Sequence, residues 1–108
     1  MNAARNYCVV FVTAPTRTVG RRLARAALEQ RLVACVNIIP QLESHYWWEG
    51  RLERSAEVLL VMKTTRGRLQ RLEQCIGERH PYSTPEFLAL PLHSGSARYL
   101  DWITASVR

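Results

Sequence analysis

The sequence is short of the features that mark a secreted or membrane protein. It has three cysteines among 108 residues, and no two of them lie close together, so a disulfide framework is not expected. Its longest uninterrupted apolar run, Tyr7–Val12, is far shorter than the roughly 20 residues that a membrane-spanning helix needs. The N-terminal segment lacks the apolar core of a signal peptide. We therefore expect no membrane contact and a reducing, cytoplasmic location.

Lysine and acidic residues are scarce as well. Of the 15 basic residues all but Lys63 are arginine, and nine Asp and Glu residues leave a net charge of +6. The arginines are spread along the chain, which predicts a solvated basic surface rather than a nucleic-acid-binding arm. The sequence has no phosphate-binding loop, dinucleotide fingerprint, zinc motif or nucleophile elbow, so no specific chemistry follows from its motifs.

What the sequence does contain is typical of a globular chain. Apolar residues make up 47% and charged residues 22%, and the length suits one domain covering 1–108. Strand-like and helix-like segments alternate along it. We expect strands at Tyr7–Ala14, Val33–Ile39, Ala56–Thr64 and Glu86–Leu92, and helices from Thr16 or Thr18 to Arg31, from Arg66 to Arg79 with Thr65 as cap, and over Ala97–Ser106. The expected apolar face of the last helix comprises Tyr99, Trp102 and Ile103.

The second strand has further features of its own. Pro40 cannot donate to a strand ladder, so it marks a bulge or an edge, after which the strand resumes over Leu42–Trp48. Glu49-Gly50 predicts a tight hairpin turn. The order of elements predicts an α+β fold: a ferredoxin-like β-α-β-β-α-β sandwich with an antiparallel sheet and an extra C-terminal helix.

The strands of this sheet are apolar on both faces. Val10 and Val12 point one way while Phe11 points the other, and Leu60 opposes Val61 in the same manner. Helices on one face would leave the other bare, and an apolar patch of that size indicates an interface. We therefore expect a homo-oligomer whose sheets pack together. The alternative is that the C-terminal helix folds over the bare face, but about ten residues are too few to cover four strands.

Several stretches also resemble one known family. They follow one another in order and cover nearly the whole chain. They are 12–15 (VTAP), 32–40 (LVACVNIIP), 44–53 (SHYWWEGRLE), 57–64 (EVLLVMKT), 80–86 (HPYSTPE), 90–91 (LP) and Gly95 with 99–103 (YLDWI). On these residues the chain resembles the CutA family, the divalent-cation tolerance proteins.

The resemblance implies a ferredoxin-like fold and a tight homotrimer, similar in architecture to the PII-type signalling proteins, with the sheets packed at the trimer centre. It also implies a cytoplasmic, non-enzymatic protein that responds to metal ions, copper above all. Some members are thought to bind copper through a first-strand cysteine and two adjacent histidines. By position these correspond here to Val12, Arg79 and His80, so His80 alone is retained as a metal ligand.

This reduced ligand set argues against a copper site of the family type. One imidazole is a poor copper site, and the charge of Arg79 would repel a metal ion. Cys8 lies four residues before Val12, about 13 Å along a strand, too far to replace the missing thiol. Copper stays the candidate cofactor. Other thiols and imidazoles could form a site only if folding or trimer contacts gathered them; these are Cys35, Cys75, His45 and His93.

Two alternatives stay open beside the metal-tolerance hypothesis. Lys63, Tyr82 and Glu86 could line a ligand-sensing cleft between subunits, although the favoured interpretation of Lys63 is that it extends to solvent or pairs with a carboxylate such as Glu57 or Glu86. A ferredoxin-like module could instead bind RNA, which needs aromatic residues on the central strands. The third strand has none, so we expect no nucleic-acid partner.

Overall fold

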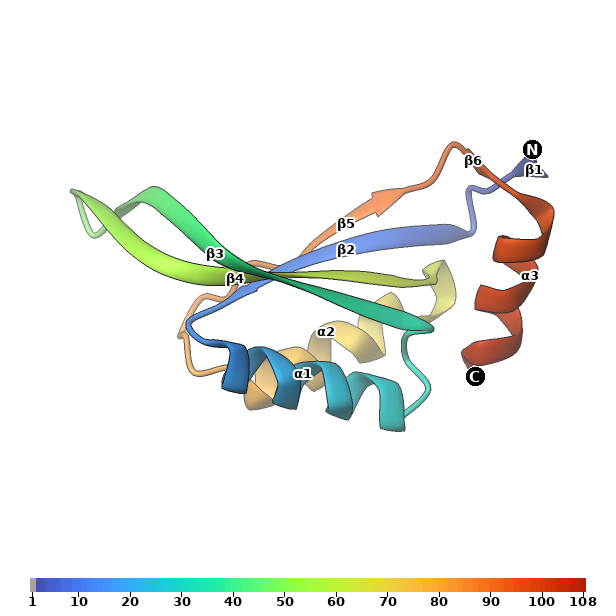
Figure 1. Ribbon diagram of the computed structural model, residues 1–108, viewed down its shortest axis with the longest axis horizontal. Helices are drawn as coiled ribbons and strands as arrows, with labels where there is room; N and C mark the ends of the chain where they lie inside the picture. Colours follow the sequence, from blue (N-terminus) through green and yellow to red (C-terminus); the bar gives the residue numbers. More distant parts are fainter. Residues whose placement is uncertain (1) are drawn as a thin grey trace.

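The computed structural model describes residues 2–108, and side chains from residue 3 onward. Its central feature is a four-stranded antiparallel sheet in the order β3-β4-β2-β5, with two helices on one face (Figure 1). The elements are β1 (Asn2–Ala3), β2 (Tyr7–Ala14), α1 (Arg17–Glu29), β3 (Cys35–Trp48), β4 (Arg51–Thr65), the 3-10 turn η1 (Arg66–Arg68), α2 (Leu69–Arg79), β5 (Leu88–Pro91), β6 (Ser94–Gly95) and α3 (Ala97–Ser106). The predicted α+β order, with its extra C-terminal helix, is confirmed. None of these helices has the length and apolar character needed to cross a membrane.

The core lies between the sheet and helices α1 and α2. The Thr16 side chain caps α1 by accepting the Val19 N–H at 3.2 Å, which settles the choice between the two predicted caps. Leu23 of α1, Leu72 of α2 and Leu60 of β4 are almost fully enclosed. Burial of each such side chain contributes about 1.5–3 kcal/mol, so this layer supplies most of the chain's own hydrophobic stabilisation.

Several local details differ from the sequence-based expectation. Thr65 makes no side-chain cap bond, and η1 precedes α2, which begins at Leu69 rather than Arg66. The last strand of the main sheet is Leu88–Pro91, shorter than predicted. A second, two-stranded sheet pairs β1 with β6; strands this short carry no periodicity that a sequence pattern could reveal.

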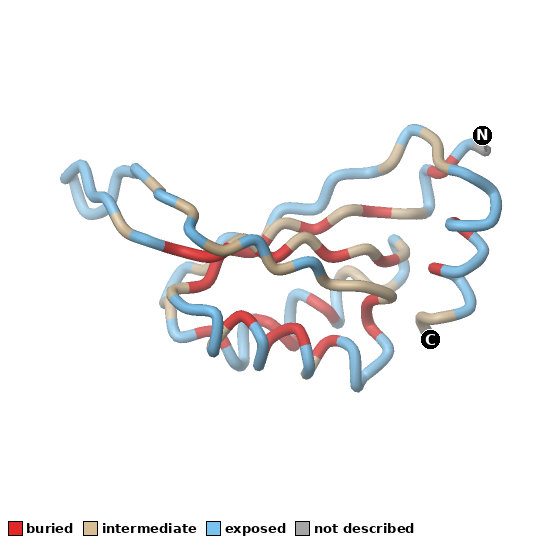
Figure 2. Tube along the Cα trace, viewed as in Figure 1, coloured by how far each residue is buried: buried red, intermediate tan, exposed pale blue. Residues whose placement is uncertain are grey.

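The face of the sheet opposite α1 and α2, here called the open face, is only partly covered. Burial alternates along β2 and β4, and the helix-facing positions are the buried ones (Figure 2). Most of the other positions put apolar side chains on the open face, with the polar residues Asn37, Lys63 and Thr13 among them, and neighbouring strands align them in rows. The rows are Asn37–Val61–Phe11–Leu88, Cys35–Lys63–Val9–Leu90 and Ile39–Leu59–Thr13.

Helix α3 covers one end of the open face and no more. Tyr7 Oη and Thr104 Oγ1 lie 2.5 Å apart, and the Arg108 N–H donates to the Arg31 carbonyl, so α3 is held at the end of the sheet. Its buried residues are Leu100 and Ile103. The predicted face included Tyr99 and Trp102, which are instead 44% exposed. The predicted bare apolar surface is therefore confirmed, and the C-terminal helix does not conceal it.

The β3–β4 hairpin extends well beyond the sheet, and we call residues 42–57 the arm (Figure 1). The register shifts between Ile39 and Leu42, where Gln41 has a φ of 61°, so a bulge bends the ladder as Pro40 predicted. The turn has positive φ at Glu49 and Gly50, as a two-residue hairpin requires. The radius of gyration is 14.4 Å, against about 13 Å for a compact chain of this length, because the arm projects.

Candidate functional site

A groove of about 850 Å³ lies where the arm meets the loop that follows α2. One wall comes from the base of the arm and the other from residues 82–86. The lining is polar and aromatic: Thr13, Leu42, Glu43, Ser44, His45, Tyr46, Trp48, Glu57, Tyr82, Ser83, Thr84, Pro85 and Glu86. Apart from its tyrosines, the groove has four titratable side chains, three carboxylates and one histidine. The groove is therefore acidic, although the chain as a whole is basic.

The innermost group of the groove is the carboxylate of Glu57. It is 7% exposed, and Tyr82 Oη donates to its Oε2 at 2.7 Å. Burial, the hydrogen bond to Glu57 and the Glu57 charge together raise the pKa of the Tyr82 phenol, so this proton is held firmly. A hydrogen bond to a charged acceptor is the stronger kind, and it offsets the cost of burying the carboxylate.

Glu86 lies close enough to Glu57 for the two charges to repel. Partial burial and the charge of Glu57 raise the pKa of the Glu86 carboxyl above its ordinary value of 4.5. Because Glu86 has no cationic neighbour among the lining residues, a positively charged group placed in the groove would relieve this repulsion.

His80 lies beside this groove, but its ring nitrogens are not free to bind a ligand. Its side chain is 9% exposed, and its Nδ1 accepts the N–H of Tyr82 at 3.1 Å. The ring proton therefore sits on Nε2, which donates to the Thr13 carbonyl oxygen at 2.7 Å. Both nitrogens are thus engaged by backbone groups, and the imidazole joins the end of β2 to the loop that carries Tyr82. His80 could bind a metal ion only by giving up one of these bonds.

The other two positions of the copper set are also occupied by structural groups. Val12 is fully buried on the helix-facing side of β2, where it pairs with Leu60. Arg79 Nη1 donates to the Cys75 carbonyl oxygen at 3.0 Å and lies 3.6 Å from Glu78 Oε1. Neither side chain offers a metal ligand, and the cation of Arg79 stays close to the one imidazole retained.

Lys63 lies apart from Tyr82 and Glu86 within one chain. It pairs in register with Val9 and Cys35, six residues along β4 from Glu57, which is about 20 Å of strand. Its ammonium donates to the Asn37 side-chain oxygen and lies 4.0 Å from Cys35 Sγ. Its partner is therefore an amide rather than a predicted carboxylate, and a site that unites Lys63 with Tyr82 and Glu86 requires two chains.

The remaining thiols and imidazoles are scattered. Cys75 is buried on α2 beside Gln30, Cys35 is half-buried on the open face, and His45 lies on the arm with Nε2 2.6 Å from Glu43 Oε2. His93 lines a separate pocket together with Cys8. Across residues 2–108, no group of three or more His, Cys, Asp or Glu side chains is arranged to hold a metal ion.

The central role of Glu57 was not predicted from the sequence. Glu57 was expected only as a possible partner for Lys63, whereas in the structure it accepts the hydrogen bond from Tyr82. The sequence did contain an indication of this role. Glu57 is a charged residue directly before the apolar run 58–62, and strand alternation places it on the same side of β4 as Leu59 and Val61. The identity of its partner was not predictable, because Tyr82 reaches it through a loop without periodicity.

The chain is similar to known proteins both in sequence and in fold. Residues 8–106 match the family model described as "CutA1 divalent ion tolerance protein". The chain is 44% identical over 95 residues to the divalent-cation tolerance protein CutA of Thermus thermophilus, covering 88% of this chain and 92% of that protein. It is also 44% identical over 100 residues to the chloroplastic protein CutA 1 of rice, Oryza sativa. That match covers 93% of this chain but only 56% of the rice protein, so the chain spans about half the length of this relative.

The fold gives the same result. The crystal structure of CutA1 from Oryza sativa superposes with a TM-score of 0.93 at 41% identity, covering 99% of this chain and 98% of that one. The match therefore includes α3 and the arm as well as the sheet and its two helices.

Proposed function

We propose, since this chain belongs to the CutA1 divalent ion tolerance protein family, that it acts in tolerance to divalent cations as a non-enzymatic homotrimer. The observation that carries the proposal is the open face. Phe11, Val61 and Leu59 are only half-buried at its centre, while Leu88 and Ile39 are 56% and 45% exposed at its margins. An uncovered apolar surface of this kind on a single chain is typical of an interface. The number three comes from the family resemblance.

The arm supports the same proposal. Trp47 and Leu52 face each other across its two strands, and they are 70% and 69% exposed. A two-stranded ribbon is at best marginally stable in water on its own, so the arm needs a surface to pack against. We assign it to the neighbouring subunit, where both of its faces would be covered.

The test of the trimer is the mass in solution of the wild type and two variants. Val61→Glu places a charge at the centre of the open face, and Gln74→Glu places the same charge on the exposed side of α2. We expect three chain masses for the wild type and for Gln74→Glu, and one chain mass for Val61→Glu. A monomeric wild type would overturn the proposal.

Copper is the divalent cation to test first, because it is the metal that the resemblance implies. Of the corresponding positions, only His80 carries a ligand, and backbone groups engage both of its nitrogens. We expect calorimetric titration with Cu(I) and Cu(II) to find no stoichiometric site on His80. Stoichiometric binding that persists in His45→Ala but is lost in His80→Asn would show that the imidazole leaves its bonds for the metal.

The acidic groove favours a second candidate function, a sensor of small molecules. Its Glu57–Tyr82 pair and its repelling Glu86 suit a ligand with an ammonium group next to an aromatic ring. Benzylamine is a suitable calorimetric probe. Saturable binding that is weakened in Glu57→Gln but not in Glu73→Gln, on the exposed side of α2, would support this function.

The proposed compartment is the cytoplasm. Its support is that Cys8, Cys35 and Cys75 are all free thiols. The rice relative is named chloroplastic, which is a different compartment.

A further inference from the structure

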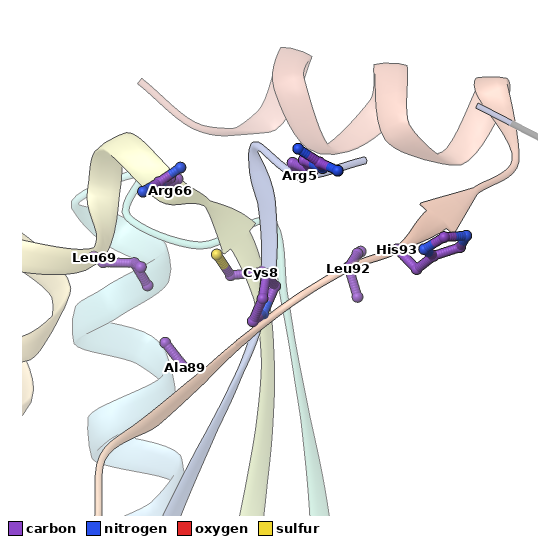
Figure 3. A pocket seen from close by; sticks show the side chains of 8 residues that line it. Arg5, Cys8, Arg66, Leu69, Ala89, Leu92 and His93 are labelled. Atoms are coloured by element: carbon purple, nitrogen blue, oxygen red, sulfur yellow. The ribbon is translucent and has the colours of Figure 1, made fainter. Parts of the chain in front are cut away.

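A second pocket, of about 540 Å³, lies at the other end of the sheet, on the side of β2 that faces the helices. Figure 3 shows the guanidinium groups of Arg5 and Arg66 above Cys8, with the His93 ring to one side. The remaining lining is apolar and comes from α2 and from β5 and the segment after it: Leu69, Ala89, Pro91 and Leu92. The pocket therefore has cationic groups at its rim and hydrocarbon within it.

Backbone hydrogen bonds hold together the three segments that carry Arg5, Arg66 and His93. The Arg66 N–H donates to the Asn6 carbonyl oxygen at 2.7 Å, which ties the start of η1 to the turn after Arg5. The Ala4 N–H donates to the His93 carbonyl oxygen at 3.2 Å, and Ala4 itself is buried. Residues 5, 66 and 93 are thus set beside one another by the main chain, not by chance contacts of long side chains.

The charges at this pocket are unbalanced. No carboxylate is among its lining residues. Within residues 3–108, the side chains of Arg5, Arg66 and His93 take part in no ion pair and no hydrogen bond to another side chain or backbone group. Two neighbouring guanidinium groups without a counter-charge repel each other. A bound anion would be attracted to both, and this attraction would offset the repulsion.

We propose that this pocket binds a small organic anion, whose phosphate or carboxylate group is held by Arg5 and Arg66 and whose apolar part lies against Leu69 and Leu92. A guanidinium presents a planar set of donors that matches both headgroups, and it stays charged at any physiological pH. His93 at the rim provides a further nitrogen for the headgroup. The apolar lining and the volume exceed what an inorganic ion uses, so the ligand is organic rather than free phosphate.

Cys8 forms the floor of the pocket and is not a ligand in this proposal. It is 3% exposed, and burial raises the pKa of its thiol, although the charge of Arg66 opposes the rise. A neutral thiol adds to the apolar lining, where it is a small hydrophobic group. The inference does not depend on the trimer or on divalent cations.

The test is calorimetric titration of the full chain at low ionic strength with four probes: phenyl phosphate, benzoate, inorganic phosphate and phenol. We expect saturable binding of phenyl phosphate or benzoate at one site per chain, weaker binding of inorganic phosphate, and none of phenol. The comparison of the first two distinguishes a phosphate from a carboxylate ligand. Added salt should weaken the binding because the attraction is between charges.

The variants separate this pocket from general attraction to a basic protein. Arg5→Gln and Arg66→Gln should each weaken binding about 10-fold or more, as the loss of a charge-assisted hydrogen bond implies. Arg22→Gln removes the same charge from the exposed side of α1 and should leave affinity within about 2-fold. All these side chains are exposed, so the variants should fold, and the mass in solution of each checks that assembly is unchanged.

Two results would overturn the inference. One is that no probe binds saturably to the wild type. The other is that Arg22→Gln weakens binding as much as Arg66→Gln, which would assign the attraction to the net charge of the chain.

Discussion

At the scale of single residues, His80 illustrates how a side chain that resembles a metal ligand can serve the fold. Its ring accepts from the Tyr82 N–H and donates to the Thr13 carbonyl oxygen; the second contact is buried and the first is part-buried. Removing the ring leaves two backbone groups without partners at a nearly buried site. Each unsatisfied group costs about 1–3 kcal/mol.

His80→Ala should therefore lower the free energy of unfolding by about 2 kcal/mol or more, measured from denaturant unfolding curves. His45→Ala is the matched control, because the His45 side chain is 62% exposed and pairs only with the exposed Glu43. That variant should change stability by less than about 1 kcal/mol. Equal unfolding curves for wild type and His80→Ala would mean that the imidazole is free for another task.

How far the candidate site was predictable follows from these same residues. The motif around His80 and Tyr82 was visible in the sequence, as was the loss of the other copper ligands at Val12 and Arg79. The hydrogen-bond partners were not visible, because Thr13 and Glu57 lie far from the loop along the chain. Local patterns indicate which element a residue belongs to, whereas long-range side-chain contacts depend on how loops pack.

Glu86 gives a prediction about pH. Its carboxyl pKa is raised in the folded chain, by partial burial and by the Glu57 charge, so the folded chain keeps this proton after the unfolded chain has lost it. The contribution of Glu86 to the free energy of unfolding therefore falls as pH rises from about 4.5 through the raised pKa, and the penalty is complete above it.

Glu86→Gln removes this penalty. The variant should be more stable than the wild type at neutral pH, and the difference should shrink as the pH is lowered towards 4.5. The gain should stay below about 1 kcal/mol, because Glu86 is exposed and solvent screens its charge. Unfolding curves over this pH range test it against Glu73→Gln as a control for charge removal. A stability difference that does not change with pH would contradict the argument.

At the scale of elements, two helical glycines make a matched pair. A Cβ at Gly20 of α1 would lie 3.2 Å from Val58 Cγ2 and 3.3 Å from Leu60 Cδ2, and both of these side chains are buried in the core. A Cβ at Gly77 of α2 would meet nothing within 4 Å. Alanine is favoured over glycine in a helix by about 0.8–1 kcal/mol at both positions, so packing decides the difference.

Gly77→Ala should raise the free energy of unfolding by about 0.5–1 kcal/mol. Gly20→Ala should lower it by about 1 kcal/mol, since overpacking a core that cannot shift costs about 1–3 kcal/mol and exceeds the helix preference. Denaturant unfolding of the two variants side by side checks this. Stabilisation by Gly20→Ala would show that α1 can move away from β4.

The sequence predicted some of the helices and strands and missed others. Strand β2 and helix α3 have the predicted bounds, because β2 is a β-branched and aromatic run that stops before Pro15 and α3 begins after the turn-forming residues 94–96. Helix α1 ends two residues early, where Gln30 and Arg31 leave the helix. The β1–β6 pair and η1 were missed because two or three residues carry no period, and the buried face of α3 was misassigned because its aromatic residues point away from the single chain.

At the scale of the whole molecule, the proposed trimer has a thermodynamic consequence. If the open faces are covered only on assembly, part of the stabilising burial exists only in the trimer, and dilution must weaken the fold. For a trimer that melts directly to unfolded chains, a tenfold rise in concentration adds about 0.9 kcal/mol per chain, two thirds of the 1.4 kcal/mol that a factor of ten represents. For a chain of this size that is roughly 4 °C in the melting temperature.

The wild type should therefore show a melting temperature that rises with protein concentration, whereas Val61→Glu should melt lower and at a temperature independent of concentration. Gln74→Glu should behave as the wild type does, because its new charge lies on the exposed side of α2. Scanning calorimetry over a hundredfold range of concentration makes the comparison. A wild-type melting temperature that does not move over that range would mean that the open face and the arm are stable uncovered, and their apolar side chains would then need a partner other than a second copy of this chain.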